Sequence, residues 1–169
     1  MFTNLRIFIV YKHNKCLYLG NRSNKCLDSC HKDLQIVARE AIKRTPMFDW
    51  GIHVGHRSIA EQQKLYQQGR TTSGPIVTYV DGVKKKSKHN YSPSKAFDFH
   101  IYVPGKPDLT WNEDTVIFIA GVIMSTAEDL RQKGIIKSKI GWGGNFDQDN
   151  IIATAEREFF DPVHIQIND

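Results

Sequence analysis

The sequence predicts a single α+β domain, in which helices pack against a mainly antiparallel sheet. Apolar residues recur at helical spacing in residues 33–44 and 113–133, whereas they alternate with polar residues in residues 96–103. The 169 residues suffice for one hydrophobic core, and neither an internal repeat nor a low-complexity linker divides them. These three observations together favour the α+β class.

Three helices are expected, and their ends can be read from the sequence. The helix at 33–44 has apolar side chains at helical spacing, and a proline follows it shortly. A second helix is predicted to begin after Ser58, because Ser58 and Glu61 have the spacing of a capping box. The longest helix, 113–133, carries an apolar stripe that would face the core, and Gly134 closes it.

The strands are expected in four segments: 51–55, 96–103, 140–146 and 160–167. Phe97 and Phe99 fall on one face of the second segment, which places Asp98 on the opposite face. The third segment runs into a tight glycine loop, and the polar segment 71–87 is expected to be a loop or hairpin.

The apolar start of the chain is too short to cross a bilayer. It also lacks the basic start and the small-residue cleavage site of a signal peptide. We therefore expect residues 1–18 to form an N-terminal extension or an edge strand, with no integral membrane segment. We also expect the protein to be made in the cytoplasm without a signal peptide.

The charge and the cysteine count narrow the classes of partner and fold. The formal net charge of +5 favours an anionic partner, which is a nucleic acid, a membrane surface or an anionic cell-wall polymer. The three cysteines, Cys16, Cys26 and Cys30, make an odd number, so a fully paired disulfide scaffold is excluded. No second Cys/His pair has zinc-finger spacing, and buried or idle thiols are expected.

Three potential metal ligands, His89, Asp98 and His164, stand in two short phrases of the chain. Two histidines and one carboxylate leave a fourth coordination position open for water, which is the arrangement of a catalytic zinc site. The eight residues between the first two ligands are enough for a loop to turn back on itself. The alternative for each side chain is a solvated or hydrogen-bonded role, and spacing alone leaves both open.

The last phrase, residues 161–166, also offers a candidate base. His164 and Gln166 are two residues apart on an expected strand and therefore face the same way. Pro162 cannot donate to a sheet ladder, so Asp161 is expected on a bend before that strand. The bend could bring Asp161 near a metal, where the carboxylate would act as a base on bound water.

These phrases form a set: Ser87-x-His89, Ala96-x-Asp98 and Asp161-x-x-His164-x-Gln166. The set resembles the zinc peptidases of the D-alanyl-D-alanine carboxypeptidase and L-alanyl-D-glutamate endopeptidase family, which includes phage endolysins and vancomycin-resistance carboxypeptidases. The upstream segment 55–71 and the phrase 142–146 are also similar, so the resemblance covers about residues 20–167. The chain lacks the glycine of the family motif SxHxxGxAxD, and its His-to-Asp spacing is two residues longer.

The resemblance implies a zinc peptidase catalytic domain over residues 19–169, with a hedgehog/D,D-peptidase-like fold. It implies that His89, Asp98 and His164 bind Zn²⁺ and that Asp161 is the general base. Arg57 would hold the substrate carbonyl oxygen. The expected substrate-binding residues are Ser87, Trp142 and Gly143. Without the resemblance, Arg57 would be read as a surface ion pair. A core position beside a tight turn is the alternative for Trp142.

The function expected from this resemblance is hydrolysis of the peptidoglycan stem peptide by a phage or prophage endolysin that reaches the cell wall after release. Cleavage between L-alanine and D-glutamate is the first choice, and D-alanyl-D-alanine carboxypeptidase action is the second. A non-catalytic, zinc-containing cell-wall-binding module on the same fold is the competing class. We expect a monomer and no nucleic-acid partner, because no basic stripe with interleaved aromatic residues is present.

Overall fold

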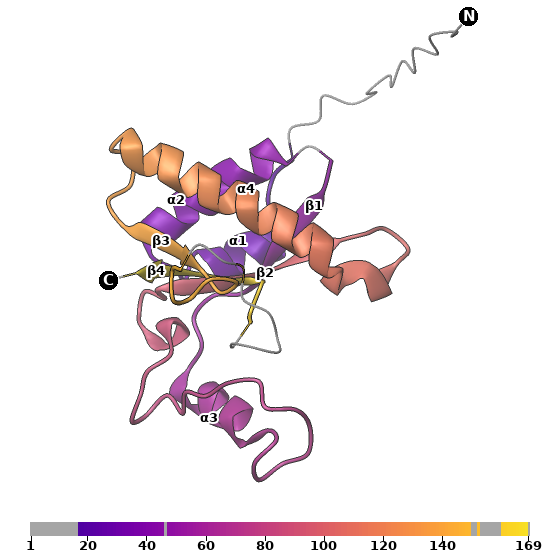
Figure 1. Ribbon diagram of the computed structural model, residues 1–169, viewed down its shortest axis with the longest axis vertical. Coiled ribbons are helices and arrows are strands. Elements are labelled where there is room, and N and C mark those ends of the chain that lie inside the picture. Colours follow the sequence, from indigo (N-terminus) through magenta and orange to yellow (C-terminus); the bar gives the residue numbers. More distant parts are fainter. Residues whose placement is uncertain (1–16, 46, 150–151, 153–159, 169) are drawn as a thin grey trace, which may run out of the picture.

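A four-stranded antiparallel sheet in the order β1-β2-β4-β3 lies at the centre of the molecule (Figure 1). The structure is a computed structural model that describes residues 17–45, 47–149, 152 and 160–168. The strands are β1 Asp49–Val54, β2 Ala96–Tyr102, β3 Lys139–Trp142 and β4 His164–Asn168. The strand that comes last in the chain therefore occupies an interior position of the sheet, between β2 and β3.

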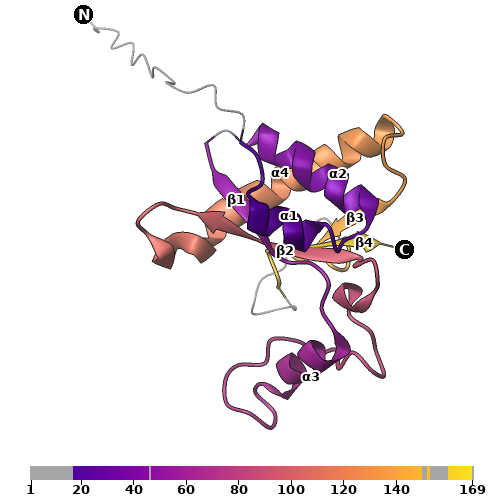
Figure 2. The same cartoon turned by 180° about the vertical axis from the view of Figure 1, so that it is seen from behind.

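Two helices, α2 (Lys32–Ala41) and α4 (Glu113–Gln132), cover one face of the sheet and enclose the core (Figures 1 and 2). The side chains of Phe97 and Phe99 point from β2 into this core and are fully buried. The alternation in residues 96–103 therefore corresponds to a strand with one buried face, and the apolar stripe of residues 113–133 faces the core, both as predicted. Burial of these apolar surfaces is the main favourable term in folding.

A short helix that the sequence did not reveal, α1 (Asn21–Leu27), packs against β1. The hydroxyl oxygen of Ser23 accepts a hydrogen bond from the Ile52 N–H at 3.0 Å. Leu27 is fully buried in the core. Helix α1 thus accepts a hydrogen bond from a backbone N–H of the edge strand β1. Without α1, this N–H would be free to pair with another chain.

Helix α3 (Ile59–Gln67) lies apart from α2 and α4, on the other side of the sheet (Figure 1). The predicted capping box is present: the Ser58 hydroxyl accepts from the Glu61 N–H, and the Glu61 carboxylate accepts from the Ser58 N–H. The long segment after α3 is irregular up to the 3₁₀ helix η2 (Lys88–Asn90), as predicted for residues 71–87. Two further 3₁₀ helices are η1 (Ile42–Arg44) and η3 (Pro107–Trp111).

The predicted fold class is confirmed, and the main errors lie at element ends. The strand expected at 160–167 begins only at His164, because residues 162 and 163 form a turn. Likewise β3 ends at Trp142, so the glycines after it belong to the following turn. The expectation for residues 1–18 concerns a segment of which residues 1–16 lie outside the described part of the chain.

Within the described ranges, no helix combines the length and the apolar character that crossing a bilayer requires.

Candidate functional site

Three side chains predicted as metal ligands meet on one face of the sheet. Asp98 in β2 and His164 in β4 are direct partners in the antiparallel register, so their side chains emerge side by side. Asp98 Oδ1 lies 2.9 Å from His164 Nδ1 and 3.1 Å from His89 Nε2. The two nitrogens are 3.2 Å apart. In the part of the chain that the structure describes, this is the one group of three or more His, Cys, Asp or Glu side chains that could hold a metal ion.

The hydrogen bonds of the two imidazoles orient both rings. His89 Nδ1 lies 2.7 Å from the Gly55 carbonyl oxygen, which can only accept, so Nδ1 carries the proton. His164 Nε2 lies 3.1 Å from Gln166 Oε1, and Gln166 was expected on the same face. Both bonds turn the other ring nitrogen of each imidazole, the one in the group, toward Asp98 Oδ1. Such partners orient metal-ligating histidines.

The histidine His89 stands in η2, and the loop that follows it is longer than in the family motif. The extra residues are accommodated because the Lys95 N–H donates to the Lys88 carbonyl at 2.9 Å and closes the loop. Ser94 in this loop is fully buried, and its hydroxyl donates to the Ala96 carbonyl at 2.7 Å. The longer spacing therefore lengthens the loop without displacing His89 from the group.

Charges inside the group influence one another strongly because its members are buried. Burial of Asp98 opposes its ionisation, yet the two adjacent imidazoles hold the pKa of its carboxyl well below the usual range. Burial acts on His164 in the opposite direction from its hydrogen bond to Asp98, and the net effect raises the pKa of His164. The group is therefore arranged around a full negative charge on Asp98.

The guanidinium of Arg57 adjoins the group from the side of α3. Arg57 Nη2 lies 3.4 Å from Asp98 Oδ2, the carboxylate oxygen that does not face the histidines. Arg57 Nη1 donates to Gln62 Oε1 at 2.9 Å. Gln62 thus holds the arginine, a role that the sequence alone did not reveal. The available signal was a glutamine at the buried face of a capped helix, five residues after an arginine.

The carboxylate of Asp161 belongs to the turn before β4, as Pro162 predicted. Its backbone N–H donates to the Gly143 carbonyl at 3.0 Å, and the Gly143 N–H donates to the His164 carbonyl at 2.8 Å. Burial and the negative charge of Asp98 raise the pKa of Asp161, against the opposing effect of the nearby cationic groups. The bend thus brings Asp161 within electrostatic reach of the group.

Two residues expected at the substrate hold this turn in place. A Cβ at Gly143 would collide with the Asp161 carbonyl oxygen, so no side chain fits there. Trp142 Nε1 donates to the Pro162 carbonyl at 2.7 Å and fastens the same turn. The third, Ser87, caps η2 by accepting from the His89 N–H at 3.3 Å. Gly143, Trp142 and Ser87 therefore contact the segments that carry the group, through their backbone or through hydrogen bonds of their side chains.

The remaining histidines that the structure describes lie outside the group. His31 caps α2, where its Nδ1 accepts from the Asp33 N–H at 3.2 Å. His100 shares a strand face with Asp98 but packs edge-on against His53, with ring centroids 5.6 Å apart. Cys26 and Cys30 are free thiols, and burial raises the pKa of Cys30 to about 12, which fits the expectation of an idle thiol.

Comparison with known proteins decides the family. A family model described as "Phage L-alanyl-D-glutamate peptidase" matches residues 16–168, nearly the whole chain. The chain belongs to this family. The resemblance inferred from the His89, Asp98 and His164 phrases is thereby confirmed.

A relative and a solved structure agree with this family assignment. A segment of 47 residues is 51% identical to the peptidoglycan L-alanyl-D-glutamate endopeptidase CwlK of Bacillus subtilis, and it covers 28% of this chain and 26% of that protein. The L-Ala D-Glu endopeptidase ChiX of Serratia marcescens has a similar fold, with a TM-score of 0.56 at 19% identity, over 91% of this chain and 92% of that one. The match to CwlK thus spans about a quarter of that relative, and the match to ChiX concerns the fold.

Proposed function

We propose that this member of the phage L-alanyl-D-glutamate peptidase family hydrolyses the L-alanyl-D-glutamate bond of the peptidoglycan stem peptide with a zinc ion. The observation that carries the proposal is the convergence of His89 Nε2, Asp98 Oδ1 and His164 Nδ1. Gly55 and Gln166 hold the outer ring nitrogens, so the two inner nitrogens would coordinate a cation that displaces any proton they carry.

The donor set fits zinc in chemistry and in spacing. Two imidazole nitrogens and one carboxylate oxygen are ligands that zinc takes in catalytic sites, with water as the fourth ligand. Ligand atoms at about 2.0–2.1 Å from a tetrahedral ion lie about 3.3 Å from one another. The separations of 2.9, 3.1 and 3.2 Å come close to that value. A zinc ion held there supplies a Lewis acid, which polarises the scissile carbonyl and acidifies the attacking water.

Asp161 is the proposed general base. Its carboxylate would take the proton of the attacking water and deliver it to the amine of D-glutamate as the peptide bond breaks. Burial and the charge of Asp98 raise the pKa of Asp161, which makes it a better proton acceptor than an ordinary surface aspartate. The hydrogen bonds of the turn to Gly143 fix the backbone that carries this carboxylate.

Arg57 is the proposed partner of the carbonyl oxygen of the scissile bond. The side chain is 16% exposed and its Nη1 is fixed by Gln62, so the guanidinium is partly desolvated and oriented before substrate arrives. A preoriented cation stabilises the oxyanion that develops in the transition state. Ser87, Trp142 and Gly143 adjoin the same group, and their contact with substrate stays a prediction.

The proposed substrate also sets the proposed place of action. The enzyme would act as a monomer on the cell wall, after release from the host cytoplasm in which it is made. The exposed run Lys84-Lys85-Lys86 shortly before His89 would attract the anionic wall polymer, in keeping with the net charge of +5.

The experiment that tests this function is digestion of purified peptidoglycan, followed by mass spectrometry of the released fragments. Native protein is expected to release fragments with a new L-alanine carboxyl and a new D-glutamate amine, and a chelator should abolish the release. Asp161→Asn should keep bound zinc but lose turnover by about 10²–10⁴-fold. His164→Ala should lose both bound zinc and turnover. The matched control is Asp108→Asn, which changes an exposed carboxylate.

The opposing outcomes separate the alternatives. Release of free D-alanine alone would assign the D-alanyl-D-alanine carboxypeptidase reaction instead. Undiminished digestion by His164→Ala would overturn the metal mechanism. Zinc binding with no bond cleaved, unaffected by Asp161→Asn, would identify a binding module.

A further inference from the structure

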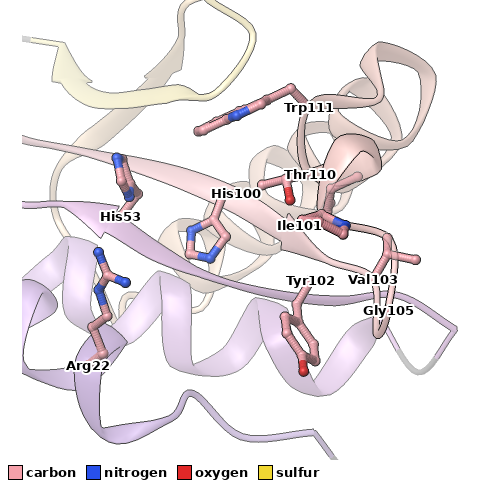
Figure 3. Close-up of a pocket in the computed structure, with 10 residues that line it drawn as sticks. Arg22, His53, His100, Ile101, Tyr102, Val103, Gly105, Thr110 and Trp111 are labelled. Atoms are coloured by element: carbon pink, nitrogen blue, oxygen red, sulfur yellow. The ribbon is translucent and has the colours of Figure 1, made fainter.

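A pocket lies on the same face of the sheet as the proposed metal-binding group, which consists of His89, Asp98 and His164, but outside that group. This pocket has a volume of about 360 Å³, within the range of about 300–1,000 Å³ that is usual for small-molecule sites. Its walls come from α1, β1, β2 and η3, and include Arg22, His53, His100, Tyr102, Thr110 and Trp111 (Figure 3). No role assigned so far uses any of these residues.

The strand β2 connects the pocket with the metal-binding group. Asp98, His100 and Tyr102 alternate with the buried residues of β2 and so lie on one face. Successive residues on one face of a strand are about 6.6 Å apart. The pocket therefore begins about one such step from Asp98, which is roughly the length of two residues of an extended peptide.

Aromatic rings form one part of the pocket wall. Trp111 is 54% exposed, and its ring stands edge-on to His53 with centroids 5.9 Å apart. His100 stands edge-on to His53, at 5.6 Å. Figure 3 shows Trp111 reaching from η3 toward the side on which the two imidazoles lie. An exposed indole and two imidazoles offer ring surface against which the C–H groups on one face of a saturated ring can pack.

Hydrogen-bond donors form the other part of the wall. Figure 3 shows Arg22 rising from α1 toward the imidazoles, and Thr110 adds a hydroxyl. None of the described residues that line the pocket carries a carboxylate. In addition, Nδ1 of His100 is buried and has no hydrogen-bond partner among the described residues. A buried polar group of this kind needs a partner that the described residues do not supply. The pocket thus suits a ligand rich in acceptors.

We propose that this pocket binds the N-acetylated sugar of the glycan strand that carries the stem peptide. The inference rests on the proposed function and names a further part of its substrate. In peptidoglycan the L-alanine is joined through its amine to the lactyl group of an N-acetylated sugar. With the bond after L-alanine at the metal-binding group, one amino acid and the lactyl group span the distance to the pocket.

The match between sugar and wall is chemical as well as geometric. One face of a pyranose ring presents C–H groups, which pack against Trp111. The acetamido carbonyl and the ring hydroxyls accept hydrogen bonds from Arg22 and the imidazole N–H groups. An apolar peptide side chain of the same size would leave the donors of the pocket without acceptors, which costs free energy.

A binding experiment tests the pocket without relying on catalysis. The probe is the methyl glycoside of N-acetylmuramic acid with its lactyl carboxyl converted to the amide, which is neutral and carries no peptide. Its titration should shift the NMR signals of the Trp111 indole and of the His53 amide. Trp111→Ala and Arg22→Ala should each weaken the binding by about five- to tenfold. Ile135→Ala, an exposed apolar residue after α4, is the matched control.

A kinetic experiment then connects the pocket with cleavage. The quantity measured is the ratio of kcat/KM for the stem tripeptide with its sugar to that for the tripeptide alone. The ratio should exceed one in the native protein and fall toward one in Trp111→Ala, whereas Trp111→Phe keeps most of it. A wrong proposed function can be told apart from a wrong pocket assignment. In that case neither substrate is cleaved, whereas the sugar probe still binds.

Two results would overturn the proposal. One is absence of probe binding to the native protein, or binding that Trp111→Ala and Arg22→Ala leave unchanged. The other is a loss of affinity for the sugar-free tripeptide in both variants, which would assign the pocket to the peptide.

Discussion

Gln62 holds the guanidinium of Arg57 against the candidate metal-binding group of His89, Asp98 and His164. Its side-chain oxygen accepts from Arg57 Nη1 at 2.9 Å, while its amide donates to the Val80 carbonyl at 2.7 Å. Gln62 is fully buried. A glutamine fixed by two partners has one orientation, and the arginine is therefore oriented through α3 before any substrate binds.

Replacing this glutamine should reduce turnover through the arginine. Gln62→Leu removes the acceptor of Arg57, and a hydrogen bond to a charged group contributes about 1.5–3 kcal/mol, so kcat should fall about ten- to a hundredfold. Zinc content should stay unchanged. The measurement is a double-mutant cycle with Arg57→Ala, in which the two losses should not add. A full additional loss from Gln62→Leu in the Arg57→Ala background would show that the glutamine acts by another route.

The packing of Gly143 against the Asp161 turn predicts a strong effect of one added methyl group. Gly143→Ala places a Cβ against the Asp161 carbonyl oxygen, so the turn must shift and move the Asp161 carboxylate, the proposed base, away from the group. Peptidoglycan hydrolysis should drop at least tenfold, since small displacements in active sites are costly. Gly121→Ala is the control, because a Cβ there meets nothing within 4 Å and replaces a helix glycine. It should stabilise the protein by about 0.5–1 kcal/mol with unchanged activity. Equal activity of the two variants would contradict the role given to the turn.

Zinc is expected to stabilise the folded chain by an amount that grows with the logarithm of its affinity. A ligand that binds only the folded state at a hundred times its Kd adds about 2.7 kcal/mol. Thermal unfolding of metal-free and zinc-loaded protein should therefore differ by roughly 5–10 °C. His164→Ala should abolish the difference, and His56→Ala, an exposed histidine outside the group, should retain it. An unchanged Tm on addition of zinc would count against a site in the folded protein.

The carboxylate of Asp33 predicts a pH-dependent part of the stability. Its Oδ2 accepts from the Ser138 N–H at 2.8 Å and from the Lys137 N–H at 3.0 Å, which ties α2 to the segment before β3. Partial burial opposes ionisation, but these hydrogen bonds prevail and lower the pKa of Asp33. A lowered folded-state pKa stabilises the fold above the ordinary pKa of about 3.9, and this contribution disappears as pH falls further.

The test compares Asp33→Asn with native protein by urea unfolding. The native protein should be more stable at pH 7, and the difference should shrink below about pH 4. A difference that stays constant down to pH 2 would mean that the charge of Asp33 is not its source.

The parts of the site that could be predicted are those governed by local patterns. The alternation around Asp98 fixed its face, and Pro162 located the bend that carries Asp161, because strand periodicity and the missing proline donor act within a few residues. The phrases around His89 and His164 supplied the ligand types. Their meeting depends on the β2–β4 register, which a single sequence does not specify.

The parts that could not be predicted depend on contacts between distant segments. Helix α1 is seven residues long and has no extended apolar stripe, and its place is fixed by the bond from Ser23 to β1. The Gly55 carbonyl orients His89 from 34 residues away, and glycine carries no side-chain signal for such a role. The start of β4 was misplaced because the turn at 162 and 163 is held by Trp142, which lies 20 residues earlier.

The interior position of β4 has a consequence for biosynthesis. Residues 164–168 leave the ribosome after every other described element, yet they supply the third strand of the sheet. Until then β2 and β3 have no common neighbour, and His164 is absent from the group. A growing chain therefore lacks one member of the His89–Asp98–His164 group until its synthesis has passed this strand, and any chemistry that needs all three side chains must wait for it.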